Sequence, residues 1–406
     1  MAKFACESPR KLSLSIGSVS AAMTAGLYIH IPFCKSRCSY CDFATDVYRS
    51  ADTVERYVAA LCKEIADTQL IPGMPPFRGG SDLRPRVDTI YFGGGTPSLI
   101  NPEQIESVIA AVHSKFNVDS SAEITMEMNP ATVTPETLTA FRSLGINRAS
   151  FGVQTFDDRS LKLLARGHDA NDARQTFGML RDAGFDNVSF DLIAGLPGQT
   201  LDAWKRNLDE AIAMTPEHLS LYLLEIHEGT PLAEQVRSKR QPQPDPELAA
   251  DMYELMLDRL AAAGYEQYEI SNLLRPGFES RHNSKYWTLD PVFGFGVSAH
   301  SFDGRQRYAN ERDTAKYVSM VEDSGSAEVI REDIDLASEF AFLGLRMERG
   351  IDLGEYSRRF GFDLAAKYRD EFERLNEDGL VEIEHSKIKL TRKGKLYSNE
   401  VFEVFV

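Results

Sequence analysis

The chain has 406 residues, with 45 Lys plus Arg against 61 Asp plus Glu, and a formal net charge of −16. The length is sufficient for one large domain and a smaller one, and the acidic balance argues against broad nucleic-acid binding, which requires many cations to neutralise phosphates. No apolar run reaches the length of a bilayer-spanning helix, so we expect no integral membrane segment, whereas peripheral membrane contact stays open.

The first segment of the chain is expected to be a disordered extension. Residues 1–22 are rich in Ser and Ala and lack the continuous apolar core of a signal peptide. The alternative is that Met23 is the true start of the protein. Because no targeting signal is recognisable, we expect a cytoplasmic location.

From residue 27, short apolar runs with strand character alternate with longer segments of helical period. Asn101 and Thr134, each followed by a proline, are typical helix caps. Repeated strand–helix units predict a mixed α/β fold, a partial (β/α)6-type barrel that carries its functional residues where strands end. The strands are predicted at residues 27–31, 87–92, 122–128, 147–153, 188–194 and 219–226, with a further candidate at 265–270.

The pattern changes after about residue 330. A helical run begins near Asp363 and ends at Asp378-Gly379, and two short strands then flank His385-Ser386, which predicts a β-hairpin. Such an order is typical of a small winged-helix-like domain, and its acidic helices make a poor surface for DNA. We therefore assign residues 23–325 to the partial barrel and residues 330–406 to a C-terminal domain.

Cysteine use indicates a reducing compartment and a metal site, because five is an odd number and the spacing is uneven. Cys6 and Cys62 are isolated, whereas the other three follow the first predicted strand within eight residues: Cys34, Cys38 and Cys41. Thiolates suit zinc or iron–sulfur clusters. A zinc site needs a fourth ligand, for which His30 is the candidate, whereas three ligands to a four-iron cluster leave one iron open. The pattern favours the iron–sulfur cluster over zinc and over three free thiols.

The run Tyr28–Cys34, which reads YIHIPFC and leads into CxxxCxxC, resembles the radical S-adenosylmethionine (SAM) superfamily. Within that superfamily, the chain from about residue 26 onward resembles the oxygen-independent coproporphyrinogen III oxidase-like proteins. The resemblance implies a [4Fe–4S] cluster on the three cysteines, with S-adenosylmethionine bound to the open iron and cleaved to a 5′-deoxyadenosyl radical.

The resemblance also implies a set of contacts to S-adenosylmethionine at or near the predicted strand ends. Taken singly, each residue has an ordinary structural explanation, such as a tight turn for the glycines or a salt bridge for the glutamate. As a series, their intervals match the family pattern: Tyr28, Tyr40, Gly94, Gly95, Thr96, Glu127, Gln154, Arg166 and Asp191.

Two features favour one branch of this family. Coproporphyrinogen dehydrogenases carry a fourth cysteine where this chain has Phe43, which puts porphyrinogen decarboxylation in doubt. The run HNSKYW, which starts at His282 within residues 265–310, resembles the HNxxYW motif of the HemW-type haem chaperones. An imidazole can ligate haem iron, so His282 is the candidate axial ligand, and His300 is the competing one.

The sequence therefore predicts a radical SAM haem chaperone that binds haem and delivers it to an apo-haemoprotein. A respiratory enzyme at the membrane face is the expected acceptor, and a homodimer is a further expectation. Three alternatives stay open: a coproporphyrinogen III dehydrogenase, a radical SAM enzyme with an unrelated substrate, and a zinc-stabilised binding module. Whether S-adenosylmethionine is turned over is also open.

Overall fold

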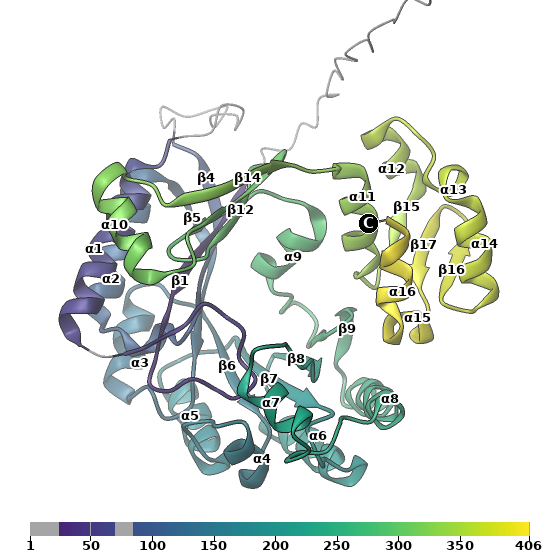
Figure 1. The fold of residues 1–406 in the computed structure, drawn as a ribbon, viewed down its shortest axis with the longest axis horizontal. Helices are drawn as coiled ribbons and strands as arrows, with labels where there is room; N and C mark the ends of the chain where they lie inside the picture. The colour runs from purple at the N-terminus through teal and green to yellow at the C-terminus, as the bar shows by residue number, and fades with distance from the viewer. Residues whose placement is uncertain (1–23, 49, 70–83, 406) are drawn as a thin grey trace, which may run out of the picture.

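The structure is a computed structural model that describes residues 24–48, 50–69 and 84–405. The predicted extension at residues 1–22, Cys6 and most of the Pro/Gly-rich segment at 71–86 lie outside the described residues. Figure 1 shows a large α/β body beside a smaller C-terminal part. Among the described helices, none is long and apolar enough to cross a membrane.

A sheet of 12 strands forms the large body, in the order β14-β13-β12-β11-β1-β4-β5-β6-β7-β8-β10-β9. Neighbouring strands from β11 to β8 run parallel, and the strands outside them pair antiparallel. The partial barrel and its six predicted strands are therefore confirmed. The parallel strands are β1 (Ala25–Ile31), β4 (Arg86–Gly94), β5 (Asn117–Met128), β6 (Arg148–Gln154), β7 (Val188–Ala194), β8 (His218–Leu223) and β11 (Val292–Phe295).

Antiparallel strands extend the sheet at both ends. The candidate strand at 265–270 is present as the short edge strand β9, beside β10, whereas β11 was not predicted and pairs with β1 on the side away from β4. The pairing of β11 with β1 joins segments that are far apart in the chain, so neighbouring residues give no signal for it. The end strands are β9 (Glu266–Glu269), β10 (Asn272–Leu274), β12 (His300–Phe302), β13 (Gln306–Asn310) and β14 (Glu328–Asp333).

Helices follow most of the parallel strands, and the predicted caps start two of them. Asn101 accepts a hydrogen bond from the Gln104 amide at 2.8 Å, and the Gln104 side chain accepts one from the Asn101 amide at 3.1 Å. Thr134 and Thr137 form the same reciprocal cap. The helices of the body are α1 (Ala51–Asp67), α2 (Pro102–Lys115), α3 (Pro135–Ser143), α4 (Asp158–Leu163), α5 (Ala170–Asp182), α6 (Leu201–Met214), α7 (Pro231–Arg237), α8 (Pro246–Ala262), α9 (Arg281–Thr288) and α10 (Thr314–Ser324).

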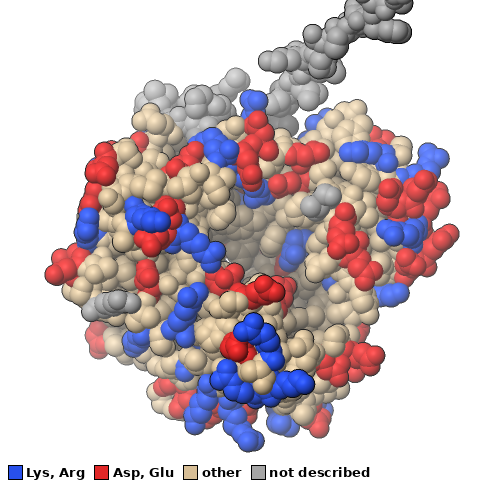
Figure 2. Space-filling model, in the orientation of Figure 1, with Lys and Arg blue, Asp and Glu red and all other residues tan. Residues whose placement is uncertain are grey.

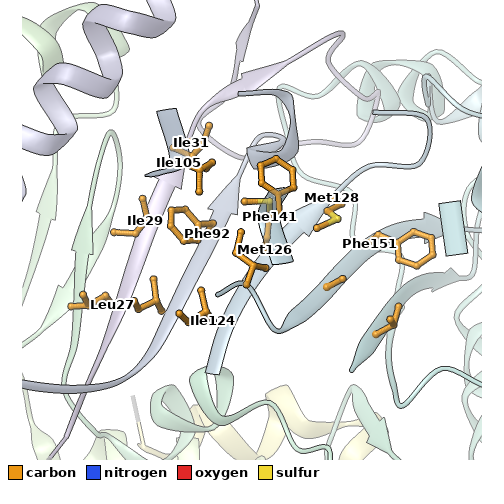
Figure 3. Packing of buried hydrophobic residues seen from close by; sticks show 14 of the residues in the cluster. Leu27, Ile29, Ile31, Phe92, Ile105, Ile124, Met126, Met128, Phe141 and Phe151 are labelled. Carbon is orange, nitrogen blue, oxygen red and sulfur yellow. The ribbon is translucent and has the colours of Figure 1, made fainter. Parts of the chain in front are cut away.

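The two faces of the parallel sheet differ in chemistry. Leu27, Ile29 and Ile31 of β1 point to the face that the helices cover, where they join one large buried cluster (Figure 3). The alternate residue Tyr28 instead stacks on Tyr91 of β4, at 6.1 Å between ring centroids. Because side chains alternate along a strand, the apolar face anchors the helices and leaves the inner face of the barrel free for polar groups.

The C-terminal part has its own hydrophobic cluster, built around Tyr356, Phe372 and Ile388. Its three-stranded sheet, in the order β15-β17-β16, contains the predicted hairpin, and the predicted helical run is present with a break at Tyr368. Its elements are α11 (Leu336–Leu345), β15 (Ile351–Asp352), α12 (Leu353–Phe360), α13 (Leu364–Lys367), α14 (Arg369–Glu377), β16 (Val381–Glu384), β17 (Lys387–Leu390), α15 (Arg392–Leu396), α16 (Ser398–Phe402) and η2 (Glu403–Phe405).

Truncation of the central strand tests the role of the apolar face. The Ile29→Ala variant is expected to lose about 2–5 kcal/mol of unfolding free energy, because Ile29 is fully buried and its loss leaves a cavity. Val329→Ala on the exposed edge strand is the control and is expected to change the unfolding free energy by less than about 0.5 kcal/mol. Urea unfolding followed by circular dichroism measures both, and equal effects would contradict this assignment of the core.

Candidate functional site

The three clustered cysteines lie on a loop that leaves the end of β1. The loop is closed by two short parallel strands, β2 (Phe33–Cys34) and β3 (Asp46–Val47). Within it, the Ser39 amide donates to the Leu164 carbonyl at 2.9 Å, and the Ser39 hydroxyl donates to the Leu163 carbonyl at 3.0 Å. These bonds tie the loop to the segment that follows β6, while the three thiols stay half-buried.

Hydrogen-bond donors point at two of the sulfurs. Burial raises the pKa of Cys34 to about 11, and the Thr96 hydroxyl, at 3.7 Å from the Cys34 sulfur, acts in the opposite direction. Burial also raises the pKa of Cys41. The Arg166 guanidinium donates to the Cys38 sulfur at 3.5 Å. These donors favour the thiolate against the larger effect of burial, which favours the thiol, and they lie where they would stabilise sulfurs that bind a metal or a cluster.

The donor set fits an iron–sulfur cluster better than it fits zinc. In the described part of the chain, no three His, Cys, Asp or Glu side chains already surround a common metal position. The proposed fourth zinc ligand, His30, has both ring nitrogens in hydrogen bonds, to the Tyr28 hydroxyl at 3.1 Å and to the Ala44 carbonyl at 2.9 Å. His30 therefore does not complete a zinc site, which leaves three thiols, the number that a cluster with an open iron requires.

The glycine-rich segment after β4 packs directly on the start of the cysteine loop. The Gly95 amide donates to the Ile31 carbonyl and the Thr96 amide to the Phe33 carbonyl, both at 2.8 Å. A β-carbon on Gly95 would lie 2.5 Å from the Pro32 carbonyl oxygen, which is too close for any other residue. This segment thus positions the loop, in addition to the role in cofactor binding that the sequence predicts for it.

Arg166 is the centre of a polar network beside Cys38. Its guanidinium donates to the Asn129 side chain at 2.5 Å and to the Gly152 carbonyl at 2.7 Å, and Asn129 donates to the Thr96 hydroxyl at 2.7 Å. Cys38, Thr96, Asn129 and Arg166 together line a pocket. Asn129 was not among the predicted site residues, and the Asn-Pro step directly after a strand was the signal that could have identified it.

Two half-buried carboxyls continue the site along the strand ends. Glu127 accepts from the Tyr91 hydroxyl at 2.8 Å and from the Gly94 amide at 3.1 Å. Burial raises the pKa of Glu127 to about 7 and that of Asp191 on β7 to about 6. Hydrogen-bond donors hold these groups in place, although burial disfavours their charged forms. Their positions suit contacts to hydroxyl or amino groups of a ligand.

The remaining predicted contacts lie in the same region. The Tyr40 hydroxyl is 3.5 Å from the Arg166 guanidinium. Gln154 has a backbone φ of 65°, and its side chain folds over Gly152, next to Arg166. The structure therefore brings the predicted residues into one neighbourhood, and their individual roles toward S-adenosylmethionine stay predictions.

His282 is enclosed. It is 0% exposed, and its ring nitrogens are hydrogen-bonded with the Thr89 hydroxyl at 2.9 Å and the Tyr286 hydroxyl at 3.1 Å. Tyr91 stacks on the ring at 5.1 Å. Both ring nitrogens are thus occupied by protein hydrogen bonds, and the role of His282 as an axial haem ligand stays a prediction. The competing residue, His300, is exposed at the start of β12.

Comparisons with known proteins agree with this geometry. The radical SAM superfamily model matches residues 28–211, and the HemN C-terminal domain model matches residues 332–397. The solved structure of coproporphyrinogen III oxidase (HemN) from Escherichia coli, described as a radical SAM enzyme, aligns with a TM-score of 0.81 at 26% identity. The alignment covers 94% of this chain and 90% of that one. Fold and site thus define a radical SAM protein with a HemN-type C-terminal domain.

Curated relatives narrow the assignment. The haem chaperone HemW of Bacillus subtilis is 35% identical over 93% of this chain and 98% of its own length. The mitochondrial radical S-adenosyl methionine domain-containing protein 1 of Bos taurus is 34% identical, over 91% of this chain and 84% of its own length. The chain belongs to the family of the HemW haem chaperones.

A matched pair of glycines tests whether the glycine-rich segment positions the cysteine loop. In Gly95→Ala the new methyl would meet the Pro32 backbone, an overlap that costs roughly 1–3 kcal/mol. We expect less than about half of the wild-type iron content after anaerobic reconstitution. Gly167→Ala, whose nearest neighbour would be the Ser36 hydroxyl at 3.9 Å, should retain full iron. The measurement is the number of iron atoms bound per chain in each variant. Wild-type iron content in Gly95→Ala would refute the positioning role.

The buried imidazole of His282 predicts that the free energy of unfolding depends on pH. Burial lowers the pKa of His282 to about 3, so the unfolded chain binds a proton at about pH 6.5 that the folded chain does not bind. The stability that this histidine contributes is therefore present above pH 6.5 and is lost as the pH falls toward 3. His282→Asn should reduce the slope of unfolding free energy against pH by up to about 1.4 kcal/mol per unit between pH 4 and 6. Urea unfolding at several pH values measures the slope, and exposed His113→Asn is the control.

Proposed function

We propose that this protein is a radical SAM haem chaperone, which binds haem and transfers it to an apo-haemoprotein. The observation that carries the proposal is the similarity to a haem chaperone over 98% of that relative's length, which includes the C-terminal domain. The proposed acceptor is a respiratory haemoprotein at the membrane face. The proposed chaperone is cytoplasmic, contacts the membrane only at its surface, and forms a homodimer.

In this proposal Cys34, Cys38 and Cys41 hold the [4Fe–4S] cluster. A bound cluster supplies the electron that cleaves the sulfonium of S-adenosylmethionine. The residues around it orient the cofactor: Arg166 and Thr96 donate hydrogen bonds at the thiolates and line the adjacent pocket. Glu127 and Asp191 offer half-buried acceptors for the hydroxyl or amino groups of the same ligand.

The second candidate function is coproporphyrinogen III oxidation, which is supported by the TM-score of 0.81 with the Escherichia coli enzyme. Phe43 opposes it. Where the oxidases carry a fourth cysteine, this chain presents an aromatic ring that is 68% exposed, on the rim of a surface pocket with Arg37 and Arg312. A phenyl group cannot replace a thiol in metal or radical chemistry, so the haem chaperone is the better reading.

The haem ligand is the open part of the proposal. His282 can reach iron only after its hydrogen bond to Thr89 or Tyr286 breaks. No protein hydrogen bond occupies the His300 ring within the described ranges, so His300 can bind iron without such a change. Both stay candidates, and the Soret spectra of His282→Ala and His300→Ala distinguish them.

Anaerobic reconstitution tests the proposed function directly. With reductant, S-adenosylmethionine and coproporphyrinogen III, we expect no sustained protoporphyrinogen formation, as measured by mass spectrometry. Haem-loaded protein mixed with a soluble apo-b-type cytochrome should convert the cytochrome to its holo form, seen as a shift of the Soret band. The triple variant C34S/C38S/C41S is the control for effects that need the cluster. Sustained porphyrin product without haem transfer would replace this proposal with the oxidase.

A further inference from the structure

The inner face of the barrel carries a second polar group of residues, away from the cysteine loop. Along β6, β7 and β8, Ser150 pairs in register with Ser189, Ser189 with His218, and Asp191 with Ser220. Arg148 opens β6, opposite Thr125 of β5. A fully apolar inner face would pack more stably, so polar residues in this position indicate a ligand.

Arg148 is a charged residue on this face whose burial is not matched by a hydrogen-bond acceptor among the described residues. Its side chain is 1% exposed, and its Nε and Nη1 atoms are buried without an acceptor in any described residue. It forms no ion pair among the described carboxylates. Burying a guanidinium without a partner is costly, and such a group is usually paired or used.

The charges around Arg148 place its guanidinium inside the barrel. Its positive charge lowers the pKa of Glu127 and of Asp191, against the larger effect of burial, and it also disfavours protonation of His218 and His282. These neighbours come from β5, β7, β8 and α9. The guanidinium is therefore central, within electrostatic range of both carboxyls but farther than a salt bridge from either.

Arg166 provides a useful contrast. Its guanidinium donates to the Cys38 sulfur, the Tyr40 hydroxyl, the Asn129 side chain and the Gly152 carbonyl. Those bonds account for a buried arginine at the cysteine loop. Arg148 has no comparable hydrogen bonds to described residues. The two arginines therefore have different roles, and a ligand at the cysteine loop does not account for the burial of Arg148.

An open space borders the carboxyl end of β8, further along the inner face than the start of β6 where Arg148 lies. Tyr222 of β8 is 44% exposed, although Asp191, Glu269 and Glu127 lie near enough to raise the pKa of its hydroxyl. Its ring thus faces a gap inside the barrel and not the outer surface. Figure 2 shows a hollow near the centre of this face, between the sheet and the C-terminal part. Tyr28 and Tyr91 stack on the opposite strands.

We propose that Arg148 binds a carboxylate of the haem cargo inside the barrel, with Tyr222 packing against the macrocycle. This inference rests on the proposed function. A guanidinium donates charge-assisted hydrogen bonds to a carboxylate, and a carboxylate oxygen at Nε or Nη1 would give an acceptor to a donor that has none in the described residues. Glu127 and Asp191 would repel a multiply charged phosphate more strongly than a single carboxylate, which favours a propionate-type group.

The dependence of haem affinity on the haem carboxylates can be measured on the wild-type protein alone. Reconstituted wild-type protein is titrated with iron protoporphyrin IX and with its dimethyl ester, and dissociation constants are read from the Soret band. Loss of a charge-assisted pair corresponds to roughly tenfold or more in affinity, so the diester should bind at least that much more weakly. Arg148→Gln should weaken only the free acid and so remove this difference. The exposed residue Arg206 of α6 supplies the control, because Arg206→Gln loses the same charge outside the barrel.

The position of the Soret band should be unchanged in Arg148→Gln, because Arg148 is not a candidate ligand of the iron. If Arg148→Gln does not fold, the dissociation constants of the free acid and the diester are compared in the wild type and in Arg148→Lys, and this comparison tests the inference in its place. Equal binding of acid and diester overturns the inference while the haem-chaperone proposal stands. Absence of any haem binding by wild type instead overturns the proposed function.

Discussion

The close approach of Gly95 to the Pro32 backbone is the constraint on which the site depends. Two backbone hydrogen bonds of 2.8 Å connect the end of β4 to the residues that lead into Cys34, and no side chain fits between them. This contact fixes where the cysteine loop leaves β1. Thr96, one residue further on, is thereby placed with its hydroxyl toward the Cys34 sulfur. The same backbone contact therefore sets both the position of the cysteine loop and the hydrogen bond to the Cys34 sulfur.

The sheet resolves a conflict between stability and function by using its two faces differently. Leu27, Ile29 and Ile31 pack under the helices and stabilise the fold. The inner face instead carries the half-buried Glu127 and Asp191, and their partial burial raises the pKa of both carboxyls. A binding site of this kind lowers stability, and the large apolar face compensates for it. The period of two along each strand makes this division visible in the sequence.

Local signals explain which parts of the molecule could be predicted. Six strands and the caps at Asn101 and Thr134 have continuous patterns in neighbouring residues, and the three cysteines have a spacing that little else produces. Arg148 and the strand β11 carry no such signal, because their importance comes from residues far along the chain that the fold brings near. Arg148 reads as an ordinary strand-start cation until its burial and lack of an acceptor are known.

The HNSKYW run shows why a motif and its mechanism need separate evidence. His282 is bonded to Thr89 of the barrel wall, and Trp287 packs under the Arg346 guanidinium at 4.4 Å, at the start of the C-terminal part. The motif therefore joins the barrel to the C-terminal domain, whatever else it binds. If His282 ligates haem iron, its hydrogen bond to Thr89 or Tyr286 must open first, so ligation would remove one of the two bonds that fix this ring against the barrel wall and α9.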